Sequence, residues 1–223
     1  KQRLDTPYVR ENGKLKKTSW DKAFKILINK LRAVNPNEVA GIVGDLADLE
    51  MMYSFKSFFK KCIGSTNLEC RQDRIYINPN ERMNYIFNSS IKGIEESDLI
   101  LLVGTNPRLE ATILNARIRK AYLKNKPKIY SIGDPGDLTY PYQNIGSSTS
   151  IIRDITSGSH EVSDKIKKSK KPLIIVGESA LYDDVGEYIF ETLKIFLVDN
   201  NFITKNWNAL NVLVQQASRV GAI

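Results

Sequence analysis

One pattern occurs three times in this chain and constrains its fold more than any other feature: a short apolar run, a glycine, a polar turn and the start of a helix. The three copies are AGIVGDLAD from Ala40, ILLVGTNPR from Ile100 and LIIVGESAL from Leu173. Short apolar runs that end at glycine are typical of strands buried on both faces. Because helical patterns separate the copies, they predict an α/β fold, a parallel sheet with helices on both faces.

The middle copy contains the candidate functional turn. Leu99 to Val103 predicts the strand, and Gly104 ends it. Thr105 and Asn106 can cap the free N–H groups of a following helix, and Pro107 suits its first turn. Open α/β sheets bind ligands at such turns, because N–H groups and the helix dipole converge there. A capped helix packed on a sheet accounts for the same residues, so both interpretations stay open.

The other elements follow from periodicity and turn residues. Asn12-Gly13 predicts a β-hairpin over residues 8–16, and Thr18 with Asp21 predicts a capped helix that ends before Pro36. We expect further strands at residues 38–43, 68–70, 128–132 and 173–176, and further helices at 48–62, 107–123, 150–155, 162–168, 188–196 and 207–220. The expected domains are a hairpin segment, residues 1–17, and an α/β domain, residues 18–223.

The chain is basic, with 33 Lys and Arg against 25 Asp and Glu, a net charge of +8. This charge could suit nucleic acid, anionic lipid or an acidic partner subunit. The basic residues lie in separate groups, such as residues 14–17 and 165–171, without an aromatic RNA-binding motif nearby. Solvated faces are therefore the favoured interpretation.

The residue types of common active sites do not form a catalytic set. His160 is the only histidine, so most histidine-based metal sites are excluded. Ser157, Ser159 and Asp164 lie near it in the sequence, but no G-x-S-x-G motif presents a nucleophile. Complete dinucleotide-binding and P-loop motifs are also lacking. We expect no catalytic residue, and we interpret His160 as a surface or loop residue.

Acidic pairs and cysteines also have structural interpretations. Glu95-Glu96 and Asp183-Asp184 flank predicted elements and are expected to cap helices or to be solvated. Cys62 and Cys70 form no Cys-x-x-Cys motif, and Cys62 is expected to be buried on the apolar side of its helix. No disulfide framework and no metal site are predicted.

No apolar run approaches the about 20 residues that a membrane span needs, and no signal peptide begins the chain. The sequence opens at Lys1 without an initiator methionine. We therefore expect a soluble piece of a longer protein, without direct insertion into a membrane.

Five stretches closely resemble one family in the same order: the large iron–sulfur subunits, of the NuoG type, of respiratory complex I, NADH:quinone oxidoreductase. They are QRLDTPYVRENGKLKKTSWDKAF, GIEESDLILLVGTNPRLEATILNARIRKAYL, IGDPGDLTY, DITSGSH and SKKPLIIVGESAL. The similarity extends from Arg3 to about Val220. Its most specific part is the run from Gly104 to Arg119, because G-T-N-P-R-x-E followed by N-A-R-I-R is far narrower than a generic turn.

The resemblance implies a molybdopterin oxidoreductase-like fold. In active members of that superfamily, the turn equivalent to Gly104, Thr105, Asn106, Pro107 and Arg108 faces a pterin-dinucleotide cofactor. In the complex I subunit the resemblance implies that this turn is vestigial, with no molybdenum or pterin. It places the family's 2Fe-2S and 4Fe-4S clusters upstream, so we expect no cofactor in this fragment.

The resulting interpretation is a structural, non-catalytic segment of an electron-transfer subunit. Glu110, Asn115, Arg117 and Arg119, with Arg108, would form internal contacts or contacts with the cluster domain. The implied partners are other peripheral-arm subunits and the cluster-bearing N-terminal region of the same subunit, without nucleic acid. The implied location is the cytoplasmic side of a bacterial inner membrane, or the matrix side of a mitochondrial one.

Two other function classes remain as alternatives. The first is the cofactor-binding domain of an active molybdopterin oxidoreductase, which requires a metal ligand such as Cys or Ser in a cofactor pocket. The second is a nucleotide- or nucleic-acid-binding α/β module that uses the +8 charge and the glycine-ended turns.

Overall fold

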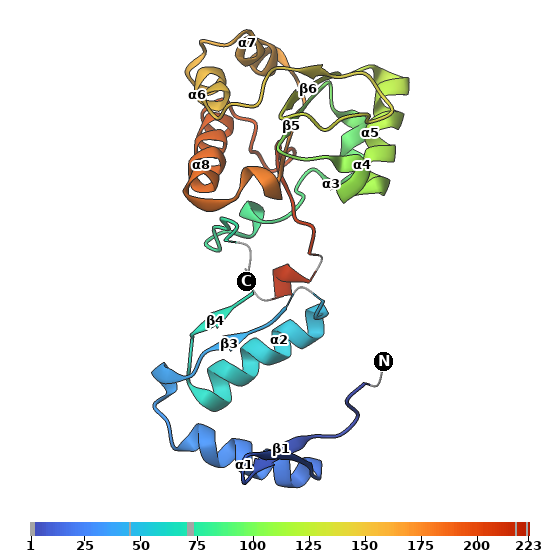
Figure 1. Ribbon diagram of the computed structural model, residues 1–223. Helices are drawn as coiled ribbons and strands as arrows, with labels where there is room; N and C mark the ends of the chain where they lie inside the picture. Colours follow the sequence, from blue (N-terminus) through green and yellow to red (C-terminus); the bar gives the residue numbers. More distant parts are fainter. Residues whose placement is uncertain (1–2, 45, 71–73, 217, 222) are drawn as a thin grey trace. The chain divides into compact units, whose positions relative to one another are not determined.

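The computed structural model describes residues 3–44, 46–70, 74–216, 218–221 and 223 (Figure 1). The chain divides into two compact units, Lys1–Cys70 and Arg71–Gly221. The division into residues 1–17 and 18–223 stays a prediction about the domains of the protein. In the described part of the chain, no helix is long and apolar enough to cross a membrane.

The first unit contains two small sheets and two main helices. Its elements are β1 (Tyr8–Glu11), β2 (Lys14–Lys17), α1 (Trp20–Arg32), the 3-10 turn η1 (Pro36–Glu38), β3 (Gly41–Ile42), α2 (Leu49–Phe58), the π-helical turn η2 (Phe59–Ile63) and β4 (Leu68–Glu69). β1 and β2 pair antiparallel around Asn12-Gly13, which confirms the hairpin. The helix cap is Ser19, one residue after Thr18, and its side chain accepts from the Lys22 N–H.

Two predictions in this unit need correction. The strand expected at 38–43 is limited to β3, and Asn35 caps a 3-10 turn, Pro36–Glu38, that takes the first expected residue, Glu38. Cys62 is exposed, whereas Cys70 is buried. The physical reason is η2: a π-helical turn changes the 3.6-residue spacing of α2, so Cys62 no longer falls on its apolar face.

The second unit contains the large sheet and its helices. Its elements are η3 (Arg82–Asn84), α3 (Ser90–Gly93), η4 (Ile94–Glu96), β5 (Leu99–Val103), α4 (Pro107–Glu110), α5 (Thr112–Asn125), β6 (Lys128–Ile132), β7 (Gln143–Asn144), α6 (Ser150–Ser157), α7 (Glu161–Lys168), β8 (Pro172–Gly177), η5 (Glu178–Ala180), α8 (Asp183–Asp199), β9 (Leu210–Leu213) and η6 (Arg219–Gly221). The helix expected over 107–123 is interrupted at Ala111, whose non-helical backbone separates α4 from α5.

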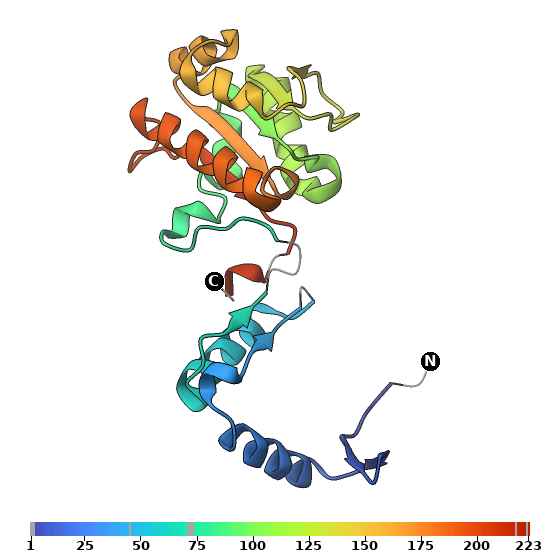
Figure 2. The same cartoon turned by 60° about the vertical axis from the view of Figure 1, so that its left-hand side comes forward.

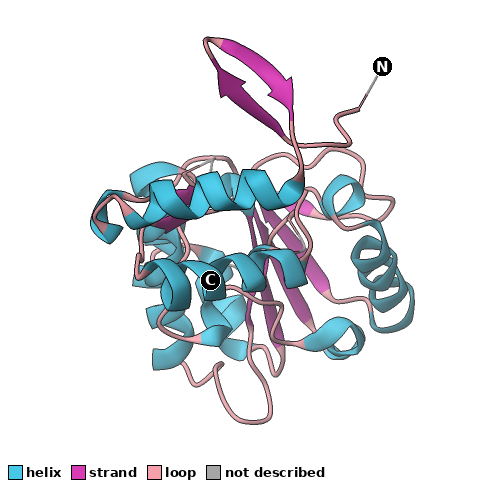
Figure 3. Cartoon of the chain, turned by 90° about the horizontal axis from the view of Figure 1, so that it is seen from below, coloured by secondary structure: helices cyan, strands magenta, loops and turns pink. Residues whose placement is uncertain are grey.

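All five strands of this sheet are parallel, in the order β7-β6-β5-β8-β9. Leu99 pairs with Lys128 on one side and with Pro172 on the other, so β5 is central. Helices lie on both sides of the strands, which confirms the predicted fold class (Figures 2 and 3).

Side chains of β5 alternate between two apolar cores. Leu99, Leu101 and Val103 join the core that includes residues of α6, α7 and α8. Ile100 and Leu102 join the core that includes residues of α5. Because every side chain of β5 is buried, its sequence is a continuous apolar run.

Two predictions about strands were wrong. Residues 207–220 were expected to form a helix, but Leu210–Leu213 is strand β9, which pairs with β8. Pairing with β8 stabilises Leu210 and Val212 as part of a strand, and this tertiary interaction outweighs the helical spacing of the apolar residues. The first copy of the repeated pattern also lies outside the large sheet, since β3 pairs only with β4 among the described strands. A local pattern indicates a strand without indicating its partner.

Candidate functional site

The turns after β5, β6 and β8 meet at the carboxyl edge of the large sheet. They enclose a cavity of about 170 Å³, lined by Gly104, Thr105, Asn106, Glu110, Gly133, Asp134, Pro135 and Ser179. The chain runs from β5 to β6 and β7 on one side and then crosses to β8 and β9 on the other. The cavity therefore lies where the strand order reverses, the usual ligand position in such sheets.

Asn106 holds two of these turns together. Its Oδ1 accepts from the Leu109 N–H at 3.2 Å, which caps α4, and its Nδ2 donates to the Pro135 carbonyl at 2.7 Å. Pro107 occupies the first helical turn, so the predicted cap is confirmed. The same side chain thus ends the turn after β5 and fixes the turn after β6.

Glu110 uses the donors of the turn itself. Its Oε2 accepts from the Thr105 hydroxyl at 2.7 Å, and its Oε1 accepts from the Asn106 N–H at 2.9 Å. A carboxylate at a helix start is favourable because it faces the positive end of the helix dipole. It also occupies hydrogen-bond donors that an anionic ligand would need.

Two glycines allow the turns after β5 and β8 to touch. Gly104 has φ +55°, and an added Cβ would lie 2.7 Å from both the Cβ and the backbone nitrogen of Ala180. A Cβ on Gly177 would lie 2.5 Å from the Gly104 carbonyl oxygen. The Ser179 hydroxyl donates to that carbonyl. The turns after β5 and β8 are therefore in direct backbone contact beside the cavity.

Arg108 and Asn115 both hold the segment after β6. The Arg108 guanidinium donates to the Asp137 carbonyl at 2.9 Å and pairs with its carboxylate at 2.5 Å. Hydrogen bonds from the Thr139 N–H and from Arg108 hold the pKa of Asp137 below its ordinary value. Asn115, which is buried on α5, donates to the Leu138 carbonyl at 3.1 Å.

Arg117 pairs with Glu95 at 2.6 Å, and Lys120 pairs with the same carboxylate at 2.9 Å. The hydrogen bond from Lys120 has the larger effect and that from Arg117 the smaller one, and both hold the pKa of Glu95 below its ordinary value. Glu96 pairs with Lys171 at 2.5 Å. Arg119 is exposed and has no ion-pair partner within the described residues. The structure thus does not bring Arg119 together with the other predicted residues.

Sequence reasoning missed Asp134, Pro135 and Ser179 as cavity residues. The sequence did indicate where they lie, because Ser179 comes two residues after Gly177, the glycine of the third copy. Asp134 and Pro135 belong to the turn after β6. It also missed buried Glu178, which lies 3.5 Å from Arg219 and accepts from the Gln215 N–H at 2.9 Å. Nothing local in the sequence indicates that contact, since 41 positions separate the two charged residues.

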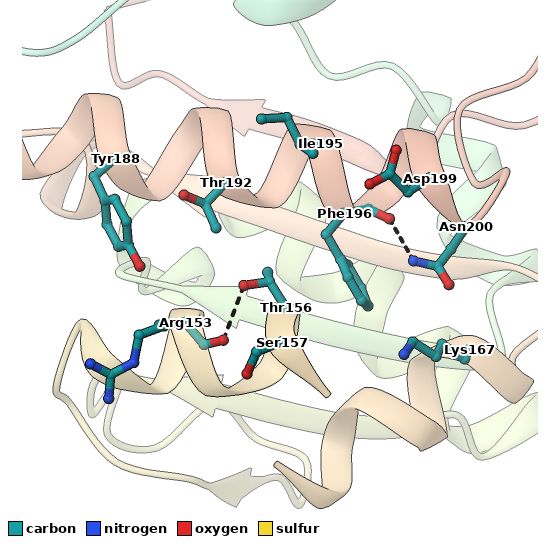
Figure 4. Close-up of a pocket in the computed structure, with 10 residues that line it drawn as sticks. All are labelled: Arg153, Thr156, Ser157, Lys167, Tyr188, Thr192, Ile195, Phe196, Asp199 and Asn200. Carbon is teal, nitrogen blue, oxygen red and sulfur yellow. Dashed lines mark hydrogen bonds between the residues drawn. The ribbon is translucent and has the colours of Figure 1, made fainter. Parts of the chain in front are cut away.

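A larger hollow of about 390 Å³ lies between α6, α7 and α8 (Figure 4). Two of its polar side chains are bonded within the chain: the Thr156 hydroxyl donates to the Arg153 carbonyl at 3.1 Å, and Asn200 Nδ2 donates to the Phe196 carbonyl at 2.8 Å. Lys167 lies over the Phe196 ring at 6.0 Å. These groups form no acid–base or nucleophile set, so the smaller cavity at the sheet edge stays the candidate site.

The other predicted residues have local roles. His160 caps α7, because its Nδ1 accepts from the Val162 N–H at 3.2 Å. Ser157 lies beside Ser159, with 3.1 Å between their hydroxyl oxygens. In the part of the chain that the structure describes, no three His, Cys, Asp or Glu side chains are grouped to hold a metal ion.

Comparisons of the chain with known proteins show the family to which it belongs. The model of the molybdopterin oxidoreductase family matches residues 3–223. The NADH-ubiquinone oxidoreductase 75 kDa subunit of Reclinomonas americana is 40% identical over the whole chain, which spans 34% of that relative. The G subunit of the NADH-quinone oxidoreductase of Rickettsia prowazekii is 37% identical over the whole chain, which spans 33% of it. The chain spans about a third of the length of the curated relatives it matches.

Proposed function

Because the chain belongs to the molybdopterin oxidoreductase family, we propose that it is a structural, non-catalytic segment of the NuoG-type iron–sulfur subunit of an NADH-quinone oxidoreductase, respiratory complex I. Electrons would pass from NADH to quinone through clusters held elsewhere in the subunit. The segment would support the cluster-bearing region and contact other peripheral-arm subunits. The names of the relatives support this proposal, since both are subunits of that enzyme.

The observation that carries the non-catalytic part is the position of Glu110. Its carboxylate accepts from the Thr105 hydroxyl and the Asn106 N–H, donors of the turn expected to face a pterin dinucleotide. The pyrophosphate of such a cofactor would meet the negative charges of Glu110 and Asp134 at close range. The donors that would offset this repulsion already bind Glu110.

The size of the cavity supports the same conclusion. Ligand pockets for small molecules usually measure about 300–1,000 Å³. The cavity at the sheet edge measures about 170 Å³, which is below that range. The residues present therefore do not fit a pterin dinucleotide, and we derive no reaction step through that group.

The remaining parts of the proposal concern the whole subunit. It would carry the 2Fe-2S and 4Fe-4S clusters in a region outside this chain. The complex would place the segment on the cytoplasmic side of a bacterial inner membrane, or on the matrix side in a mitochondrion. Oxidoreductase activity would belong to the assembled complex, and the segment alone would catalyse no reaction.

Native mass spectrometry tests the proposal. We expect this chain at its bare mass of 25.3 kDa, and the full-length subunit with only iron and sulfide added. A bound pterin dinucleotide or molybdenum in either protein would contradict the proposal and favour an active molybdopterin oxidoreductase. A retained nucleotide would instead favour the nucleotide-binding alternative.

A further inference from the structure

We propose that the hollow between α6, α7 and α8 is a docking groove for an amphipathic α-helix of a neighbouring subunit (Figure 4). One flank of that helix would be acidic and the other basic. The inference rests on the proposed function, because a subunit of a larger complex has neighbours that can supply such a helix. The residues that carry it all lie within the second unit, Arg71–Gly221.

The first observation is a stripe of side chains along the outer face of α8. Val185, Tyr188, Thr192 and Ile195 follow one another at spacings of three, four and three residues. Side chains at this spacing share one side of a helix, and two helices pack against each other through such stripes. Val185, Tyr188 and Ile195 are 47%, 44% and 58% exposed. About half of each of these three side chains is therefore left uncovered by the described residues.

The second observation is the groove beside this stripe. It measures about 390 Å³, and Thr156 and Ser157 of α6 line it opposite α8 (Figure 4). Phe196 of α8 is buried and also lines it. The stripe from Val185 to Ile195 extends for about 15 Å of helix, which matches about three turns of a second helix. An apolar groove between two helices is a common binding site for an amphipathic helix.

The third observation is the charge on the two sides of the stripe. On the side of α6 and α7, Arg153 and Lys167 are exposed and line the groove. Asp184 and Glu187 of α8 are also exposed. With 3.6 residues per turn, these two acidic residues fall on the side of the stripe away from the groove-lining Phe196. The stripe thus has a basic side and an acidic side.

These charges select the occupant. A docked helix would place its acidic flank beside Arg153 and Lys167 and its basic flank beside Asp184 and Glu187, which also fixes its direction around the stripe. Nucleic acid and an anionic lipid surface, which the net charge of +8 could suit, would be repelled by the acidic side and by Asp199, which lines the groove. The observations therefore favour a protein helix over a polyanion.

Photo-cross-linking in the assembled complex tests the proposal, with p-benzoylphenylalanine in place of Ser157, which is exposed at the rim of the groove. We expect one cross-link to a neighbouring subunit. The linked segment should have apolar residues at every third or fourth position, acidic residues on one flank and basic residues on the other.

Ile195→Asp should lower the yield of this cross-link at least about tenfold, because it buries an unpaired carboxylate in the contact. The matched control is Ile91→Asp on α3. Ile91 lies outside the groove and is 50% exposed, against 58% for Ile195. It should leave the yield unchanged, and equal losses for the two variants would contradict a role of the stripe.

Charge reversal tests the orientation of the helix. Arg153→Glu should lower the yield about fivefold, because it opposes two negative charges at the rim. Reversing the acidic residue of the linked helix that faces position 153 should restore the yield. Failure of every such reversal to restore it would contradict the predicted charge pattern.

Four other results would overturn the proposal. A cross-link within the same polypeptide would assign the groove to another segment of the subunit, and a cross-link to a second copy would assign it to self-association. A cross-link to a segment without the predicted pattern would exclude an amphipathic helix. The absence of any cross-link in the complex would show that the groove stays open. The mass measurement of the proposed function does not involve the groove, so the two proposals fail separately.

Discussion

The Tyr140 hydroxyl donates a hydrogen bond to Asn115 Oδ1 at 2.8 Å inside the apolar core beside α5. Asn115 in turn donates to the Leu138 carbonyl at 3.1 Å. Both side chains are buried, Asn115 at 6% and Tyr140 at 7% exposure, so neither polar group can turn to solvent instead. One side chain on α5 thus fixes the segment after β6 at two points. That segment supplies Asp134 and Pro135 to the cavity.

Removing the Tyr140 hydroxyl should lower the stability of the second unit. Tyr140→Phe leaves Asn115 Oδ1 buried without that donor, and we expect a loss of about 1–2 kcal/mol in the free energy of unfolding. Urea denaturation with an unchanged m-value would measure it. The control is Tyr142→Phe, whose hydroxyl bonds lie at the exposed turn around Asp134 and Gly136. We expect less than about 0.5 kcal/mol there.

Gly104 should tolerate no side chain. Gly104→Ala combines φ +55° with a Cβ 2.7 Å from the backbone of Ala180, so we expect a loss of about 2–4 kcal/mol. Gly136→Ala is the matched control, because Gly136 has φ +68° but no atom within 4 Å of an added Cβ. It should cost only about 1 kcal/mol. Equal losses for the two variants would show that the contact with Ala180 is unimportant.

Glu95 should contribute stability that disappears in acid. Lys120 and Arg117 hold its pKa below the ordinary value of 4.5. A carboxyl with a lowered folded-state pKa stabilises the fold above its ordinary pKa, and this contribution is lost as the pH falls through the folded value. The Tm of the wild type should therefore fall more steeply below pH 4.5 than that of Glu95→Gln. Parallel curves for the two proteins would contradict this linkage.

Arg108→Ala should loosen the turn without affecting a chemical step. The variant loses the contacts to the carboxylate and the carbonyl of Asp137. Because this ion pair is exposed, we expect only a small fall in Tm, about 1–3 °C. The NADH-quinone activity of the assembled complex should stay at the wild-type value. An unchanged Tm would show that the contact does not hold the turn, and lost activity with normal assembly would argue against a structural role.

The sequence predicted the elements whose causes are local. β5 and β6 occupy the predicted residues because their apolar runs end at defined turns, and Asn106 caps α4 because the capping side chain and the free N–H groups are neighbours. The hairpin at Asn12-Gly13 and the parallel arrangement with helices on both faces followed in the same way. The resemblance to the family rested on such local motifs, and the family model together with the similar relatives confirms it.

Partners distant in the sequence were decided only by the tertiary structure. Residues 210–213 form a strand because they pair with β8. β3 pairs with β4 outside the large sheet. The π-helical turn after α2 moved Cys62 to the surface. Ser179 and Asp134 reached one cavity only because the strand order brings the turns after β8 and β6 beside that after β5. Local propensity fixes where the chain forms strands and helices, whereas burial and hydrogen bonding between distant residues select which of them meet.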